Sequence, residues 1–233
     1  MMASRASVLP PKALVGMVHV HALPGTPHNN KTVQQIIDIA VSESVALERA
    51  GFDAIILENM HDTPYLNREV GPEIVACMTA VCAAVHHAVH IPIGIQVLAG
   101  ANRAALAVAQ AGGASFCRCE GFVFAHVADE GMMNSDAGML LRYRRQIGAD
   151  NIAIYADIKK KHSAHAITAD VSIAETAKAA HFFNADGVIV TGVATGDPCS
   201  VDDVRNTSQA LPQGAMKTLV GSGLCIPLKW MVP

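Results

Sequence analysis

The chain has 233 residues, a formal net charge of −3 at neutral pH, 51% hydrophobic residues and 16% charged residues. This composition is typical of a compact folded domain and excludes disordered and fibrous chains. Charged residues or histidines interrupt every long apolar run, so no membrane span is predicted. A slightly acidic chain without a basic stripe also lacks the charge pattern that binds nucleic acid or an anionic membrane.

Six cysteines occur without a C-x-x-C pair, which argues against a zinc ribbon and against a disulfide framework. Residues 1–12 are predicted to form a flexible segment, which contains serines, Arg5 and Lys12 but no acidic residue. This composition resembles a mitochondrial transit peptide only faintly. We therefore expect a cytoplasmic protein, with a mitochondrial location as the alternative.

Short apolar runs alternate along the chain with segments of helical periodicity, which is the pattern of a βαβα fold. Helix starts are indicated at Thr32, Pro72 and Asp170. The predicted strands cover residues 13–20, 54–59, 92–98, 115–120, 151–158, 187–192 and 217–223. The predicted helices cover residues 33–50, 72–89, 101–112, 136–147, 170–183 and 201–210.

The Val-rich and Ile-rich strands indicate a parallel sheet that is buried on both faces. Two α/β folds fit this pattern, a doubly wound sheet and a (β/α)8 TIM barrel. No G-x-G-x-x-G follows the first strand, so the dinucleotide-binding fold loses its main support. Polar residues instead gather at the carboxyl ends of the strands, where a barrel holds its active site. We therefore predict the TIM-barrel type.

Seven strand-helix units are recognisable and the eighth is missing. We expect a single barrel domain over residues 13–223 and a divergent tail over residues 224–233, which reads LCIPLKWMVP and contains two prolines. This ending predicts a truncated or alternatively ended form of a longer barrel. The first and seventh strands would then have unpaired edges, and Trp230 is the side chain best able to cover the gap.

The first predicted strand ends in V-H-V-H, which puts His19 and His21 on one face of an extended chain. Metal-dependent hydrolases of the barrel type begin their sites in this way, but they need further ligands from later strands. Those ligands are missing here. We assign no metal and no cofactor, and a metal-dependent hydrolase is kept only as a lesser alternative.

Carboxylates lie near the ends of two predicted strands. Glu58 belongs to the second strand, and Asp157 belongs to the fifth, shortly before Lys161 and His162. Burial and neighbouring charges can push the pKa values of such groups apart, so they can divide the roles of general acid and base. The adjacent Lys159 and Lys160 are interpreted as solvated loop charges.

Further polar residues at strand ends are candidates for binding a substrate. Gln96 and Arg118 belong to the third and fourth predicted strands, and Thr191-Gly192 ends the sixth. The seventh strand runs into Gly221-Ser222-Gly223. Glycines at this point of a barrel let backbone N–H groups approach a phosphate, so the sequence predicts a phosphate site there.

Six motifs occur in order along the chain, and together they resemble the BtpA family of (β/α)8 barrels, which is named for a photosystem I biogenesis factor. They are GMVHVHALPGTP at 16–27, ILENMHDTPY at 56–65, VGPEIVACMTA at 70–80, ADIKKKH at 156–162, VIVTGVATG at 188–196 and LVGSG at 219–223. The resemblance implies a barrel of the phosphate-binding kind. The positions that match the family are His19, Glu58, Asn59, Asp157, Lys161, His162, Thr191 and Gly192.

The leading hypothesis is an enzyme that binds a small phosphorylated metabolite, such as a sugar phosphate, and performs proton-transfer or lyase chemistry with Glu58, Asp157 and His162. The alternative is a non-catalytic assembly or stability factor that binds a partner protein. A homo-oligomer is compatible with either hypothesis.

Overall fold

A computed structural model describes residues 8–221 and residue 223. The predictions for Ser222, Trp230 and the tail therefore lie outside the described residues. The described residues divide into two compact units: unit 1 holds residues 8–118 and 140–153, and unit 2 holds residues 119–139, 154–221 and 223. Each unit is described by itself.

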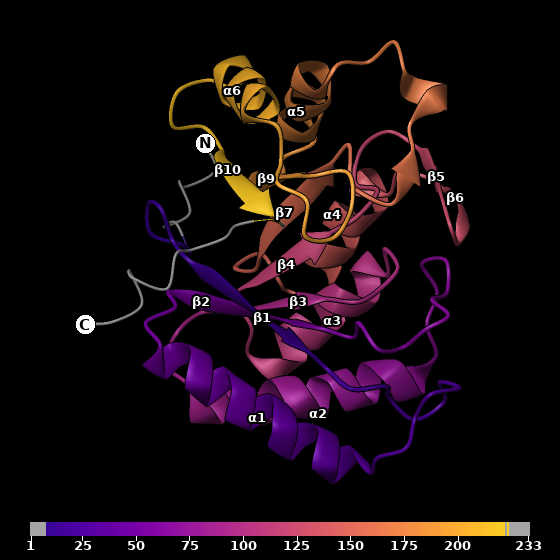
Figure 1. Ribbon diagram of the computed structural model, residues 1–233, viewed down its shortest axis with the longest axis vertical. Helices are drawn as coiled ribbons and strands as arrows, with labels where there is room; N and C mark the ends of the chain where they lie inside the picture. Colours follow the sequence, from indigo (N-terminus) through magenta and orange to yellow (C-terminus); the bar gives the residue numbers. More distant parts are fainter. Residues whose placement is uncertain (1–7, 222, 224–233) are drawn as a thin grey trace. The chain divides into compact units, whose positions relative to one another are not determined.

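Unit 1 is built on four parallel strands that pair in chain order (Figure 1). They are β1 (Val15–His19), β2 (Ala54–Glu58), β3 (Ile93–Gln96) and β4 (Phe116–Cys119). The strands β2 and β3 are buried along their whole length. Such near-continuous burial is expected of a parallel sheet that helices cover.

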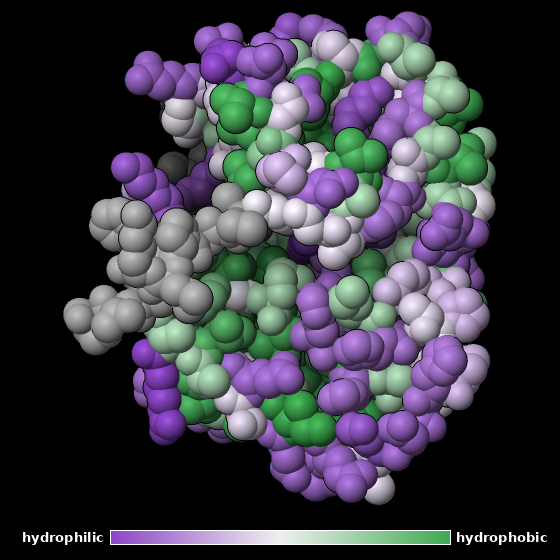
Figure 2. Space-filling model, viewed as in Figure 1, coloured by the Kyte–Doolittle hydropathy of each residue, from purple (hydrophilic) through white to green (hydrophobic). Residues whose placement is uncertain are grey.

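Three helices follow the first three strands: α1 (Val33–Arg49), α2 (Pro72–Ala88) and α3 (Asn102–Gly112). Thr32 and Gln35 form a capping box at the start of α1, and Pro72 occupies the first turn of α2. Both starts agree with the sequence signals. In Figure 1, α1 and α2 lie side by side, and the corresponding region of Figure 2 is mostly hydrophilic on its outer face.

Unit 2 contains the parallel strands β7 (Ala153–Ile158), β9 (Gly187–Thr191) and β10 (Lys217–Gly221), which pair in that order. The helices α5 (Ile173–Phe182) and α6 (Val201–Ala210) lie beside each other in this unit (Figure 1). The helix α4 (Ala137–Gln146) has its first residues in unit 2 and the rest in unit 1.

The last parallel strand, β10, is less buried than its neighbour β9. β9 is buried at all five positions, whereas β10 is half-buried at all five. Among the described residues, β10 pairs with β9 alone and β1 pairs with β2 alone. A strand that has a neighbour on only one side buries less of its surface.

A small antiparallel sheet in unit 2 was not predicted from the sequence. It consists of β6 (Gly131–Met133), β5 (His126–Ala128) and β8 (Ser163–Ala164), and the 3-10 helix η1 (Ala166–Thr168) follows it. β5 and β6 form a hairpin in the long connection between β4 and α4. The sheet thus joins the loops that follow β4 and β7.

Within residues 8–221, seven parallel strands alternate with six α-helices, an α/β fold of the TIM-barrel type. The fold class is as predicted, and most element ends differ from the predicted ones by one or two residues. The start of α5 was predicted wrongly. Ser172 rather than Asp170 caps this helix, because its side chain accepts a hydrogen bond from the Glu175 N–H. No helix in the described part of the chain is long and apolar enough to cross a membrane.

Candidate functional site

The strand register of unit 1 aligns three of the predicted site residues in one row. His19 pairs with Glu58 across β1 and β2, and Glu58 pairs with Gln96 across β2 and β3. The His19 Nε2 atom lies 3.5 Å from Glu58 Oε2. Gln96 is fully buried, while Arg118 in β4 is half-buried. His19, Glu58 and Gln96 thus end three neighbouring strands, and the site roles predicted for them stay predictions.

Asn59 and Asp62 form a closed hydrogen-bond network immediately after β2. The Asn59 Oδ1 atom accepts a bond of 2.7 Å from the Leu98 N–H, and its Nδ2 atom donates one of 2.9 Å to Asp62 Oδ2. The Asp62 Oδ1 atom accepts from the Leu23 N–H at 2.8 Å. Both polar side chains are buried and bonded to the protein itself. The network therefore joins the loops after β1, β2 and β3.

The carboxyl group of Asp62 is costly to ionise. Burial raises the pKa of Asp62 above its ordinary value, although hydrogen bonds from the Leu23 N–H and from Asn59 oppose the shift. These bonds stabilise the charged form and desolvation disfavours it. The predicted role of Asn59 in substrate binding stays a prediction, because its amide group already bonds to the protein.

The two histidines of the V-H-V-H motif have different neighbours. His19 lies beside Glu58, whereas the ring of His21 stacks on His61 with the centroids 5.4 Å apart. Within the part of the chain that the structure describes, no group of three or more His, Cys, Asp or Glu side chains could hold a metal ion.

Unit 2 contains a small polar cavity of about 20 Å³ at the carboxyl end of β7. Such a volume holds about one water molecule. Asp157, Lys159 and Lys160 line it from β7 and the following loop, and His126 and His165 line it from the small antiparallel sheet and the segment before η1. Residues with a carboxylate, two amino groups and two imidazoles therefore line one small cavity, which we call the β7 cavity.

The two lysines are not the solvated loop charges that the sequence suggested. The Lys160 side chain is only 10% exposed, and its Nζ atom lies 3.7 Å from Oε1 of the buried Glu120. The Lys159 Nζ atom donates bonds of 2.7 Å and 3.1 Å to the carbonyl and hydroxyl oxygens of Thr168. The interpretation of Lys160 as solvated was wrong because the small sheet and Glu120, which enclose it, were not recognised.

Desolvation lowers the pKa of Lys159 from its ordinary value, and the negative charge of Asp170 opposes this shift. The cavity also has unusual backbone geometry. Phe124 and Lys159 line it with φ angles of 58° and 47°, which lie in the left-handed region. Such conformations cost energy for side chains other than glycine, and they concentrate at functional sites.

Other predicted residues of unit 2 connect the loops after β7 and β9. The Lys161 N–H donates to Thr191 Oγ1 at 3.1 Å, and His162 Nε2 lies 2.9 Å from Thr195 Oγ1. His162 is exposed and does not line the β7 cavity. The catalytic roles predicted for Lys161 and His162 stay predictions.

The glycines that were expected to cradle a phosphate lie against the chain itself. A Cβ atom added at Gly192 would clash with the Asp197 carbonyl oxygen, and one added at Gly223 would clash with the Asp197 and Pro198 backbone. At Gly221 the nearest atoms to the added Cβ would be the side-chain methyl groups of Ile189 and Thr191, at 3.1 Å and 3.4 Å. Gly192 and Gly223 thus permit the close approach of the loop after β9, and their role toward phosphate stays a prediction.

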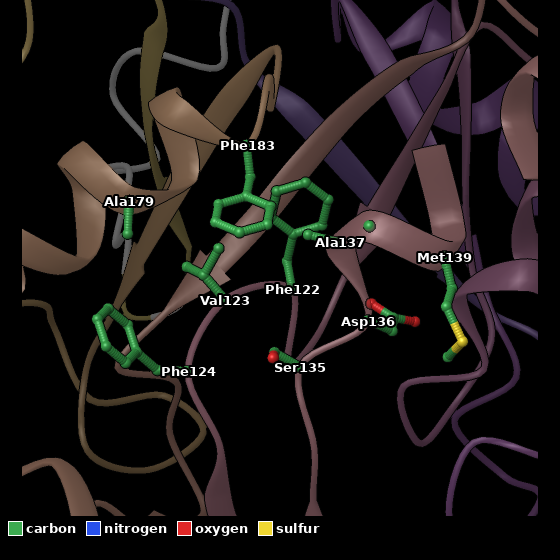
Figure 3. A pocket seen from close by; sticks show the side chains of 10 residues that line it. Phe122, Val123, Phe124, Ser135, Asp136, Ala137, Met139, Ala179 and Phe183 are labelled. Atoms are coloured by element: carbon green, nitrogen blue, oxygen red, sulfur yellow. The ribbon is translucent and has the colours of Figure 1, made fainter. Parts of the chain in front are cut away.

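A larger cavity of about 360 Å³ lies elsewhere in unit 2. Figure 3 shows Phe122, Phe124 and Phe183 around it, and the polar side chains in its lining are Ser135 and Asp136. Phe124 lines both cavities of unit 2. The larger cavity is mostly apolar and brings together no pair of groups suited to acid-base chemistry.

Comparison with known proteins places this geometry in a family. The model described as the BtpA family matches residues 10–227. An uncharacterized mitochondrial protein of Caenorhabditis elegans is 48% identical over 215 residues, which cover 90% of this chain and 76% of that protein. The photosystem I biogenesis protein BtpA of a Synechocystis strain is 33% identical over 210 residues, covering 90% of this chain and 72% of that protein.

Among solved structures, the chain is similar to the N-acetylmannosamine-6-phosphate 2-epimerase of Clostridium perfringens, with a TM-score of 0.54. The likeness covers 94% of this chain and 81% of the epimerase, at 11% sequence identity. At this identity the comparison supports the barrel-type fold alone.

Proposed function

The chain belongs to the BtpA family, and from this premise and the geometry of unit 2 we propose that it is an enzyme. The substrate that we propose is a small phosphorylated metabolite, with sugar phosphates as the first candidates. The proposed reaction is a proton transfer to or from the group that enters the β7 cavity.

One observation carries the proposal: buried Asp157 faces the same enclosed space as two lysines and two histidines. Proton transfer needs a group that accepts a proton within reach of the reacting atom and a neighbour that stabilises the charge that develops. In the proposal Asp157 accepts the proton, and the Lys160 ammonium group offsets the negative charge that appears on the substrate.

In the proposal, the positive charge of Lys160 binds the anionic group of the substrate. Lys160 is held near Glu120 at 3.7 Å, which is longer than a direct hydrogen bond. An incoming phosphate or carboxylate can therefore compete for this cation. Because the β7 cavity has room for about one water, only the reacting group of the substrate enters it, and the phosphate binds at its mouth.

The small antiparallel sheet contributes to the same chemistry. His126 of β5 and His165 before η1 cover the cavity opposite the end of β7. Excluding water from a polar site strengthens the electrostatic interactions within it. We therefore assign the sheet the role of a cover over the reacting group.

Relatives and neighbours bear on the proposal in different ways. The printed name of the epimerase states that it acts on a sugar phosphate, which is compatible with the substrate class, although the fold likeness alone does not carry a substrate across. The name of the Synechocystis relative refers to photosystem I biogenesis. A non-catalytic assembly factor is therefore the outcome against which the enzyme must be tested.

A thermal-shift screen of sugar phosphates with matched double variants tests the proposal. The variant E120Q/K160Q neutralises the buried pair while keeping side chains of similar size, and E175Q/K178Q does the same to an exposed pair on α5. A ligand at about 100 times its Kd stabilises a protein by about 2.7 kcal/mol. We expect this stabilisation in the unmodified protein and in E175Q/K178Q, and its loss in E120Q/K160Q. No shift with any phosphorylated compound would favour the assembly factor.

We further propose a mitochondrial location, which was the alternative from the sequence. The support is the mitochondrial designation of the Caenorhabditis elegans relative at 48% identity. Fractionation of cells that produce the tagged full chain tests it. Recovery with matrix markers is expected, and recovery with cytosolic markers alone would overturn it.

A further inference from the structure

We propose that Lys159 is a covalent nucleophile that forms an imine with the carbonyl carbon of the metabolite bound at the β7 cavity. This inference rests on the proposed function, and it narrows the substrate class to phosphorylated aldehydes and ketones.

Two hydrogen bonds fix the amino group of Lys159 in place. Its Nζ atom donates to the Thr168 carbonyl at 2.7 Å and to Thr168 Oγ1 at 3.1 Å. The hydroxyl of Thr168 in turn donates to the His165 carbonyl at 3.4 Å, so its oxygen can accept from the lysine. Two N–H groups are thereby occupied. In the neutral amine the remaining position of the nitrogen is the lone pair, which is the group that attacks a carbonyl carbon.

The charge environment separates Lys159 from its neighbour. The Lys160 Nζ atom lies 3.7 Å from the Glu120 carboxylate, whereas the Lys159 Nζ atom donates to two oxygens of Thr168 and is influenced by the negative charge of Asp170. Desolvation also lowers the pKa of Lys159, which increases the fraction of neutral amine at a given pH. Lysines that form imines are activated by desolvation and by neighbouring cations. Of these two factors, desolvation acts on Lys159, and Lys160 lines the same cavity.

The backbone at Lys159 supports a functional role. Its φ angle of 47° lies in the left-handed region, which a lysine adopts only where the surroundings hold it. Two hydrogen bonds to Thr168 and the wall of the cavity hold it here. An unfavourable conformation that is held at a cavity wall is the arrangement expected of a group positioned for chemistry.

Imine formation needs no reactant other than the Lys159 amine and the carbonyl group of the substrate. The neutral Lys159 amine forms a carbon–nitrogen bond to the carbonyl carbon, and the carbonyl π electron pair moves to its oxygen. Asp157 takes a proton from the nitrogen and returns it to that oxygen, so a carbinolamine results. The nitrogen lone pair then forms the second carbon–nitrogen bond as the carbon–oxygen bond breaks. Asp157 takes the remaining proton from the nitrogen and passes it to the leaving hydroxyl, so the products are a neutral imine and one water.

Reductive trapping tests the inference on the unmodified protein. The full chain is incubated with dihydroxyacetone phosphate and cyanoborohydride, which reduces an imine to a stable secondary amine. The peptide from Asp157 to Ala169 is released by cleavage before aspartates, and its fragmentation spectrum distinguishes Lys159, Lys160 and Lys161. The exposed Lys178 of α5, which pairs with Glu175, serves as the internal reference for unspecific labelling.

We expect labelling at Lys159 to exceed that at Lys178 by more than about tenfold, because desolvation and position activate this amine. Glycerol 3-phosphate, which has no carbonyl group, should compete and lower the labelling. The K159R variant should lose the label from this peptide, while K178R should keep it. Equal labelling of Lys159 and Lys178, or labelling of Lys160 instead, would overturn the inference.

Failure of the imine and failure of the proposed function give different results. If dihydroxyacetone phosphate and glycerol 3-phosphate both raise the melting temperature but Lys159 is not labelled, the imine is wrong and the binding site stands. If neither compound raises the melting temperature and no label appears, both proposals fall. Labelling of the unmodified protein remains decisive if K159R does not fold.

Discussion

The Asn59–Asp62 network of unit 1 and the β7 cavity of unit 2 both contain buried polar residues near the carboxyl end of a parallel strand. In the network, the described side-chain bonds run to other groups of the protein, among them the backbone N–H groups of Leu23 and Leu98. In the cavity, Asp157 and the two lysines face an enclosed space. Similar residue types at similar places in the fold therefore have different surroundings.

The difference lies in what the buried carboxylate meets. Asp62 accepts hydrogen bonds from a backbone amide and a side-chain amide, so its bonds hold loops together. Asp157 lines a cavity together with two lysines, and in the proposed function this cavity admits the reacting group of the substrate. We infer that substitutions in the network change the stability of the protein, and that substitutions at the cavity change the binding and turnover of a ligand.

The largest effect is expected from D157N, which removes the proposed proton acceptor and preserves the shape of the side chain. Loss of a general base lowers turnover by about 10² to 10⁴-fold. The measurement is deuterium exchange from solvent into dihydroxyacetone phosphate, followed by NMR. The exposed Asp150, which pairs with Arg145, provides the control variant D150N. Equal exchange rates in D157N and D150N would contradict the role of Asp157.

The next largest effect is expected from N59A in the network. The substitution leaves the buried Leu98 N–H and the Asp62 carboxylate without their partner, and each such loss costs about 1 to 3 kcal/mol. Denaturant unfolding should report a lower free energy of unfolding. The β7 cavity should still bind its ligand, so sugar phosphates should still raise the melting temperature of this variant. A variant as stable as the unmodified protein would show that the network does not hold the loops.

The pH dependence of stability gives a third test. The pKa of Asp62 is raised in the folded protein above its ordinary value of 3.8, so the folded state binds this proton more tightly than the unfolded state. The resulting stabilisation is fully present below pH 3.8 and is lost as the pH rises through the raised pKa.

The free energy of unfolding of the unmodified protein, minus that of D62N, should therefore fall as the pH rises through this range. Unfolding in urea at a series of pH values measures the difference. A difference that stays constant or rises with pH would mean that hydrogen bonds from the Leu23 N–H and Asn59 outweigh the burial of Asp62.

The smallest effect is expected from H19Q. His19 lies 3.5 Å from Glu58, but its side chain is 42% exposed, and ion pairs of this kind contribute about 0 to 1 kcal/mol. Denaturant unfolding should therefore change little, and the contrast with N59A separates an exposed pair from a buried network. A loss as large as that of N59A would show that the row of His19, Glu58 and Gln96 is also structural.

The parallel strands and the helices could be predicted from the sequence because each carries a local signal. Apolar runs such as residues 54–58 indicate buried strands, and Thr32 and Pro72 indicate where helices start. The antiparallel sheet escaped because β5 and β6 have three residues each, which is too short for a periodic pattern. A turn signal existed in Asp129-Glu130-Gly131, between the two strands.

Prediction of the site was limited by contacts between distant residues. Asp157 was identified because it directly follows an apolar run. Lys159 and Lys160 belong to a run of three lysines, which by itself indicates a solvated loop. Their burial depends on Thr168 and Glu120, and no local pattern connects these residues. For the same reason the closing of the loop after β9 against Gly192 could not be foreseen.

Hydrogen–deuterium exchange with and without dihydroxyacetone phosphate tests the central claim, that ligand binds at the β7 cavity and not at the network. The account predicts slower exchange in residues 121–126 and 157–168, which carry most of the cavity lining, and unchanged exchange in residues 59–62. Slower exchange confined to residues 59–62, or no change in either region at saturating ligand, would contradict it.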